Sequence, residues 1–127
     1  MLNSIEDTLQ KTCLVGLSYF DVQKVLLKQS ILAGKVIAVD KEMGITIALI
    51  DKEMKVNDQS AKFILPSDLS CWFSAPQGEF HTSLQNVKII NPDYLVTWDI
   101  YQTKEHQNSN EQQWWQWRPR AEVPKIG

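Results

Sequence analysis

The segment from Val25 to Asp40 limits the possible folds more than any other part of the chain. It carries the alternating apolar residues of a strand, but it is too long to stay straight in a small domain. Gly34 interrupts it, and a residue without a Cβ atom tolerates a sharp bend and a close backbone approach. Because a bent strand can belong to two crossed sheets, this segment predicts a very small barrel.

A tight turn is predicted after this strand. We expect Asp40 to end the strand and Met43-Gly44 to form the turn, because these residue types favour tight turns. The Asp40 carboxylate can brace the turn by accepting hydrogen bonds from backbone N–H groups. Apolar residues then alternate again from Ile45 onward, so the chain returns as a second strand.

Strand patterns and turn formers continue along the rest of the chain. Ser4 followed by Asp7 is a helix-start signal, so a short N-terminal helix is expected, with Ile5, Leu9 and Cys13 on one face. Strands are then predicted at residues 13–20, 25–40, 45–51, 62–73, 83–90, 94–102 and 113–118. We therefore predict one mainly β domain over residues 1–127, a small sandwich or barrel.

Composition excludes several classes of protein. A formal net charge of −2 argues against wholesale attraction to nucleic acid or to a membrane surface, although it leaves room for a local basic patch. The two cysteines give neither a disulfide framework nor a zinc motif. The polar, acidic N-terminus is unlike a signal or transit peptide, and no apolar run reaches the roughly 20 residues that span a bilayer. We expect a soluble cytoplasmic protein.

The bent strand and its turn also carry a family pattern. The residues that form it, in register, are Leu32, Gly34, Val36, Val39, Asp40 and Met43. This layout resembles the first sequence motif of the Sm-like (Lsm/Hfq) family, and the family's second motif would fall on residues 63–73. The resemblance implies a strongly bent Sm-like or SH3-like barrel with a core at about residues 13–73. Beyond that core, the strand patterns themselves predict an added C-terminal β-hairpin within an extension at about residues 83–120. The resemblance further implies a homo-oligomeric ring built by edge-strand pairing, and RNA as a ligand class.

Two positions depart from the RNA-binding members of that family. Those members use an Asn of the first motif and an Arg of the second to hold a base. Gly44 and Leu65 stand at these positions here, and neither side chain can form a hydrogen bond. We therefore interpret Gly34, Asp40, Met43 and Gly44 as structural residues, and we expect any RNA contact to lie elsewhere.

The stretch QQWWQWRPR, from Gln112 to Arg120, is the most unusual local feature. Side chains alternate between the two faces of a strand, so a hairpin with residues 94–102 would bury Trp98, Trp115 and Trp117. The outer face would then hold Trp114, Arg118, Arg120 and Tyr101. Such a surface suits stacking on a base with phosphate contacts, and it equally suits a protein interface. In a third interpretation Trp114 covers a neighbouring layer of the domain and the arginines pair with Asp99 or Glu122.

No catalytic, metal or cofactor site is predicted. The chain has no phosphate-binding Gly-rich loop, nucleophile motif or paired carboxylates, and His81 has no partner at metal-ligand spacing. The first hypothesis is a non-catalytic, oligomeric binding or scaffold protein that binds single-stranded RNA, with Lys35 and Lys41 as secondary phosphate contacts. The second is an SH3-like module that grips a protein partner through its Trp-rich face. An enzyme with an unrecognised site is a third hypothesis, without support in any motif.

Overall fold

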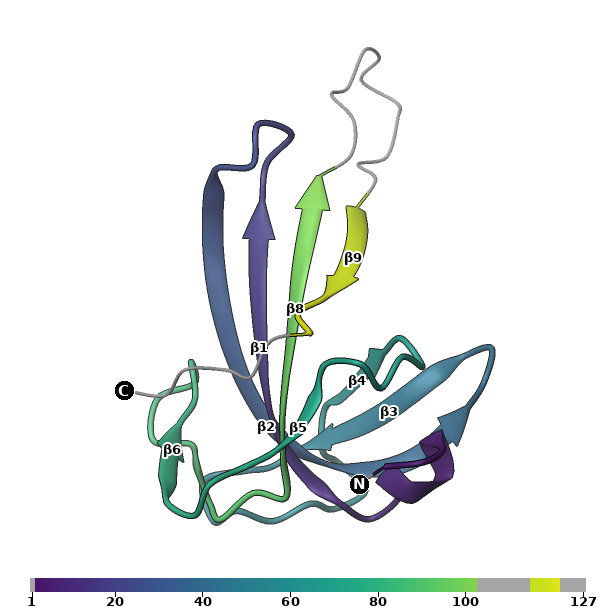
Figure 1. Cartoon of the computed structure of the whole chain (residues 1–127). Coiled ribbons are helices and arrows are strands. Elements are labelled where there is room, and N and C mark those ends of the chain that lie inside the picture. Colours follow the sequence, from purple (N-terminus) through teal and green to yellow (C-terminus); the bar gives the residue numbers. More distant parts are fainter. Residues whose placement is uncertain (1, 103–114, 122–127) are drawn as a thin grey trace.

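The computed structural model describes residues 2–102 and 115–121, and within them it confirms the predicted mainly β fold (Figure 1). The elements are the 3₁₀ helix η1 (Ile5–Thr8) and the strands β1 (Thr12–Phe20), β2 (Leu26–Asp40), β3 (Gly44–Leu49), β4 (Lys62–Leu65), β5 (Trp72–Ser74), β6 (Glu79–His81), β7 (Lys88–Ile90), β8 (Tyr94–Gln102) and β9 (Trp115–Pro119). None of the helices in the described residues is long and apolar enough to cross a membrane.

Some element boundaries differ from the predicted ones. The strand predicted at 62–73 is interrupted between β4 and β5, because Pro66 cannot donate a ladder hydrogen bond. The strand predicted at 83–90 is shorter, and β6 was not predicted, since three residues carry too little pattern. The N-terminal helix ends before Cys13, which lies in β1: the backbone at Gln10 turns to φ +67°, and its N–H donates to the Val36 carbonyl at 2.9 Å.

Most strands belong to one long, strongly curved sheet. Its strand order is β4-β3-β2-β1-β8-β5, with β9 also paired to β8, while β6 and β7 form a separate hairpin. β8 lies beside β1 in parallel, with Cys13 opposite Tyr94 and Phe20 opposite Tyr101. The predicted barrel is not closed in the described residues, because β8 takes the place beside β1. β5 pairs with β8, and the end strands β4 and β5 do not pair with each other.

β2 passes from pairing with β1 to pairing with β3 at Gly34, but within one sheet and not between the two crossed sheets that were predicted. The strand pairs with β1 from Leu26 to Lys35 and with β3 from Gly34 to Asp40. A Cβ atom at Gly34 would lie 2.5 Å from the Ala48 carbonyl oxygen and 2.5 Å from Ile47 Cγ2. No side chain fits there, so the close approach of β2 to β3 at this point requires glycine.

The turn between β2 and β3 has the predicted brace. Asp40 Oδ1 accepts the backbone N–H groups of Glu42 at 2.8 Å and Met43 at 2.9 Å. These two hydrogen bonds lower the pKa of the Asp40 carboxyl below its usual range, with the Met43 bond contributing most. Gly44 follows with φ +110°, and a Cβ atom there would lie 2.3 Å from the Leu65 carbonyl oxygen.

The main core fills the concave side of the curved sheet. Its buried residues come from both ends of the chain: Ile5, Cys13, Val15, Leu17, Val36, Ile45, Ile47, Leu65, Cys71, Trp72, Val96, Trp98 and Ile100. A second, smaller cluster packs beneath the β6–β7 hairpin and contains Ala33, Ile50, Val87 and Ile89. The core therefore depends on the strands β1 and β8, which are distant in sequence.

Gly34→Ala is expected to lower the free energy of unfolding by about 3 kcal/mol, because the added methyl group must push the β3 backbone away. Gly16→Ala is the matched control. A Cβ atom at Gly16 would meet only Thr97, at 3.7 Å, so this change should stay within about 1 kcal/mol of the parent chain. Urea unfolding of the two variants measures the difference, and equal stabilities would contradict the close approach of β3 to Gly34.

The buried thiol of Cys13 should make the free energy of unfolding depend on alkaline pH. Burial raises the pKa of Cys13 from 9.0 to about 12. Below pH 9 the thiol is protonated in both the folded and the unfolded chain, and its contribution to stability is complete. Between pH 9 and 12 only the unfolded chain releases the proton, so stability falls by up to about 1.4 kcal/mol per pH unit from this group. Urea unfolding should show a steeper decline for the parent chain than for Cys13→Ala, and parallel declines would contradict the assignment.

Candidate functional site

The four strands β2, β1, β8 and β9 extend beyond the main core as a projecting sheet (Figure 1). We call this sheet, together with the turn between β1 and β2, the arm and define it as residues 17–30, 98–102 and 115–120. Within it Trp98 lies opposite Pro119 and Gln102 lies opposite Trp115. The arm gathers most of the binding residues predicted from the Trp-rich stretch, so it is the candidate functional site.

One face of the arm carries the tryptophans, and we call it the tryptophan face. Trp98 is buried, with 2% of its surface exposed, and its ring lies edge-on to Trp117 at 5.8 Å between centroids. Trp117 is half-buried and also contacts Phe63 of β4, at 6.1 Å. The predicted core positions of Trp98 and Trp117 therefore hold, the second one in part.

Trp115 does not lie in the core, and its predicted burial is wrong. It sits two residues farther out on the edge strand β9, keeps 36% of its surface exposed and packs edge-on against Tyr19, at 5.9 Å between centroids. Lys28 Nζ lies 5.0 Å from the centre of the same Tyr19 ring. The outer part of the tryptophan face thus presents an indole, a phenol and an ammonium group to solvent.

The opposite face carries a row of stacked groups, which we call the arginine face. Phe20 and Tyr101 stack at 4.8 Å with an interplanar angle of 15°, and the Arg118 guanidinium lies 5.3 Å from the Tyr101 centre. Phe20 and Arg118 come from the strands on opposite sides of β8. Tyr101 is therefore flanked on both sides, and the outer groups of the row are Phe20 and Arg118.

Arg120 has a different role from Arg118. Its guanidinium is paired with the Asp99 carboxylate, with Nε donating to Oδ2 at 3.3 Å, and its backbone N–H donates to the Thr97 carbonyl at 3.0 Å. The interpretation that an arginine pairs with Asp99 is thus confirmed for Arg120. Arg118 instead donates to Gln116, at 3.3 Å, and stays exposed. Trp114 lies outside the described residues.

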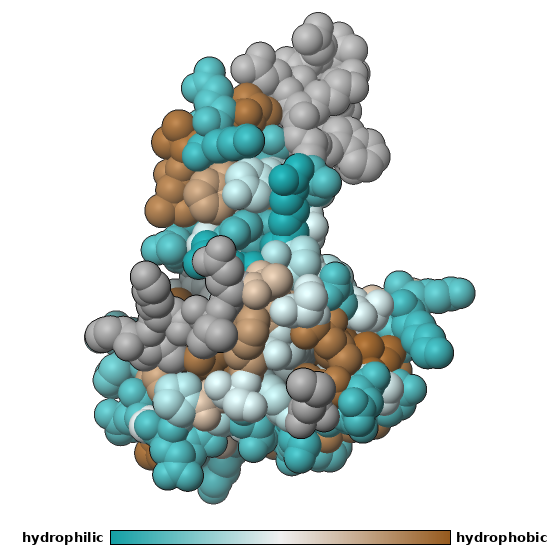
Figure 2. All heavy atoms as spheres, in the orientation of Figure 1, coloured by the Kyte–Doolittle hydropathy of each residue, from teal (hydrophilic) through white to brown (hydrophobic). Residues whose placement is uncertain are grey.

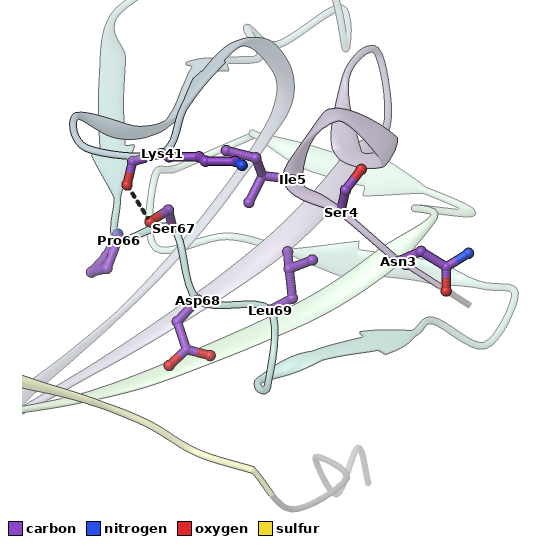
Figure 3. Close-up of a pocket in the computed structure, with 8 residues that line it drawn as sticks. All are labelled: Asn3, Ser4, Ile5, Lys41, Pro66, Ser67, Asp68 and Leu69. Carbon is purple, nitrogen blue, oxygen red and sulfur yellow. Dashed lines mark hydrogen bonds between the residues drawn. The ribbon is translucent and has the colours of Figure 1, made fainter.

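Lys35 and Lys41 are not brought together with the arm. Lys35 is half-buried in the middle of β2, and Lys41 lies in the turn at the far end of that strand. Lys41 helps to line a surface pocket of about 720 Å³ between η1 and the β4–β5 connection, where its carbonyl accepts the Ser67 hydroxyl at 2.9 Å (Figure 3). The other lining residues are Asn3, Ser4, Ile5, Pro66, Asp68 and Leu69.

This pocket and the remaining polar groups of the described residues carry few charged side chains that could act together. Lys41 and Asp68 are the charged side chains of the pocket lining, and their neighbours are neutral. Within residues 2–102 and 115–121, no three His, Cys, Asp or Glu side chains cluster as metal ligands would. His81 is exposed, and its Nε2 lies 3.8 Å from a Glu79 carboxylate oxygen.

Comparisons with protein-family models, curated proteins and solved structures gave no match.

The exposed aliphatic residues of the arm were missed at the sequence level. Val25, Leu26 and Leu27 expose 56%, 48% and 53% of their surfaces, and Figure 2 shows this apolar strip along the outer edge of the arm. A signal was present, because three consecutive apolar residues on a strand cannot all point into one core.

Trp117→Ala is expected to destabilise the fold by about 3 kcal/mol, because it removes the contacts with Trp98 and Phe63 that hold β9 against β8 and β4. Trp115→Ala serves as its matched control on the same strand and should cost about 1 kcal/mol, since much of that ring is already exposed. Thermal and urea unfolding provide the comparison. An equal loss in both variants would show that Trp115 is buried in solution.

Proposed function

We propose that this chain is a non-catalytic binding module that uses the arm to bind a protein partner. The observation that carries the proposal is the strip of exposed aliphatic side chains at Val25, Leu26 and Leu27, on the β2 side of the arm. The exposed indole of Trp115 lies on the opposite, β9 side of the arm. Contiguous exposed apolar groups are typical of interaction sites, and Trp, Tyr and Arg contribute strongly to protein interfaces. The arm combines these residue types on one projecting sheet.

Single-stranded RNA is the second candidate ligand. The arginine face favours it, because Phe20 and Arg118 end a row on which bases could stack, and a small pocket of about 180 Å³ beside Arg118 also contains Lys24. Three features weigh against it. Arg120 is neutralised by Asp99, Tyr101 is flanked on both sides, and the chain is acidic overall. A protein partner is therefore the better proposal.

We also propose a Sm-like relationship and homo-oligomeric assembly. The strand order β4-β3-β2-β1, the close approach of β3 at Gly34 and the Asp40 turn support the first. The open ends of the curved sheet supply edges for the second. The buried, unpaired thiols of Cys13 and Cys71 fit a reducing compartment such as the cytoplasm.

The double variant Val25→Ser/Leu27→Ser is expected to lose at least about tenfold of the protein-partner binding, because both apolar contacts are removed from the arm. The matched control is Met43→Ser/Ile64→Ser, which replaces two exposed apolar residues at the other end of β2 and on β4. The parent and variant proteins should be immobilised and exposed to the same cell extract. The amount of each protein that they retain is then compared by mass spectrometry.

The same preparations should be titrated with U-rich, A-rich and mixed RNA oligonucleotides by fluorescence anisotropy. The proposal expects no RNA binding that depends on Arg118. Micromolar binding that weakens with added salt and is lost in Arg118→Ala, together with equal protein retention by all variants, would replace the protein partner by RNA. Equal protein retention by the arm variant and its control would by itself overturn the assignment of the arm.

A further inference from the structure

The outer edge of β2 within the arm has open backbone hydrogen-bonding positions. β2 pairs with β1 along its inner edge, and β3 covers its outer edge only from Gly34 onward. At Ile31 the edge is occupied by Ser83. The Ser83 backbone N–H donates to the Ile31 carbonyl at 2.8 Å, and the Ser83 hydroxyl oxygen accepts the Ile31 N–H at 2.7 Å. Between Leu26 and Ser30, no strand of the described chain lies on this side.

Ile31 shows which backbone groups of this edge point outward. Its N–H and C=O face away from β1, since both are bonded to Ser83. Successive residues of a strand alternate in direction, so the N–H and C=O of Gln29 also point outward. Those of Lys28 and Ser30 point inward to β1. Gln29 therefore offers one donor and one acceptor to an added strand.

The side chains along this edge indicate what such a strand would contain. Val25, Leu26, Leu27 and Ile31 expose between 40% and 56% of their surfaces, which suits apolar partner residues. Lys24 and Lys28 flank the first three of them, and residues 24–31 contain no Asp or Glu. The neighbouring Asp21 carboxylate already accepts the backbone N–H groups of Gln23 and Val25, at 2.8 and 2.9 Å. A second copy of the same edge would bring lysines together, whereas an acidic segment would be attracted.

We propose that the β2 edge from Leu26 to Ser30 binds an extended, acidic and apolar segment of a partner protein by strand addition. This inference rests on the proposed protein-binding function of the arm. Main-chain hydrogen bonds to Gln29 supply affinity, and the apolar residues and the two lysines select the sequence of the added strand. Ser83 sets the inner limit of the added strand, because it already occupies the edge at Ile31.

The test uses a fluorescein-labelled synthetic peptide that alternates glutamate and valine, and a twin peptide that alternates lysine and valine. Anisotropy titrations at low salt should give binding of the acidic peptide that is about tenfold tighter than that of the basic peptide. Gln29→Pro should abolish binding, because proline has no N–H to donate at this outward position and leaves the β1–β2 ladder intact. Gln29→Ala keeps the backbone donor and should bind like the parent chain.

A second variant keeps the test informative if Gln29→Pro does not fold. Lys24→Glu/Lys28→Glu leaves the backbone unchanged and should reverse the preference between the two peptides. In two-dimensional NMR spectra, the acidic peptide should slow hydrogen exchange at the Gln29 amide. A preference that does not reverse, or an amide of Gln29 that exchanges equally fast with the peptide bound, would overturn strand addition.

Failure of the inference can be told apart from failure of the proposed function. If the acidic peptide binds equally to Gln29→Pro and Gln29→Ala but not to Val25→Ser/Leu27→Ser, the arm binds protein by another mode and only strand addition falls. If neither peptide binds and RNA does, both proposals fall. A dimer in sedimentation velocity that dissociates in Gln29→Pro would make a second copy the occupant and overturn the acidic partner.

Discussion

The parallel pairing of β1 with β8 is the contact on which the rest of the structure depends. It pairs residues that are 81 positions apart in the chain, and it is anchored where the Asp93 carboxylate accepts the N–H of Thr12 at 2.9 Å and its hydroxyl at 3.1 Å. β2 continues the sheet on one side of this pair and β9 on the other. The same two strands fill the core with their inner halves and form the arm with their outer halves, so core packing and the candidate binding surface share one support.

The arm offers three distinct surfaces on that support. On the tryptophan face, Trp117 contacts Phe63 of β4. The arginine face is a row of stacked groups with Arg118 at its outer end. The third surface is the edge of β2, where aliphatic side chains and backbone groups meet solvent between two lysines. Burying apolar area and pairing backbone groups both favour association at this edge, which is why we assign the partner there.

Local chemistry explains which parts of this structure could be predicted from the sequence. The need for glycine at position 34, the Asp40 brace and the pairing of β8 with β9 follow from turn residues and alternating patterns close together in the chain. The position of β8 beside β1 could not be predicted, because parallel pairing between distant segments leaves no local signal. The predicted burial of Trp115 was wrong for the same reason, since the strand order determines which tryptophan lies at an edge of the sheet.

Amide hydrogen exchange of the protein alone, followed residue by residue by NMR, reports directly on whether the arm is a formed sheet with an open β2 edge. If the arm is a stable sheet with an open β2 edge, the amides of Lys28 and Ser30, which bond to β1, will exchange slowly, and the amide of Gln29 between them will exchange fast. Fast exchange at all three residues would show that the arm is not a formed sheet. Slow exchange at Gln29 would show that this edge is already covered, and either result would contradict the account.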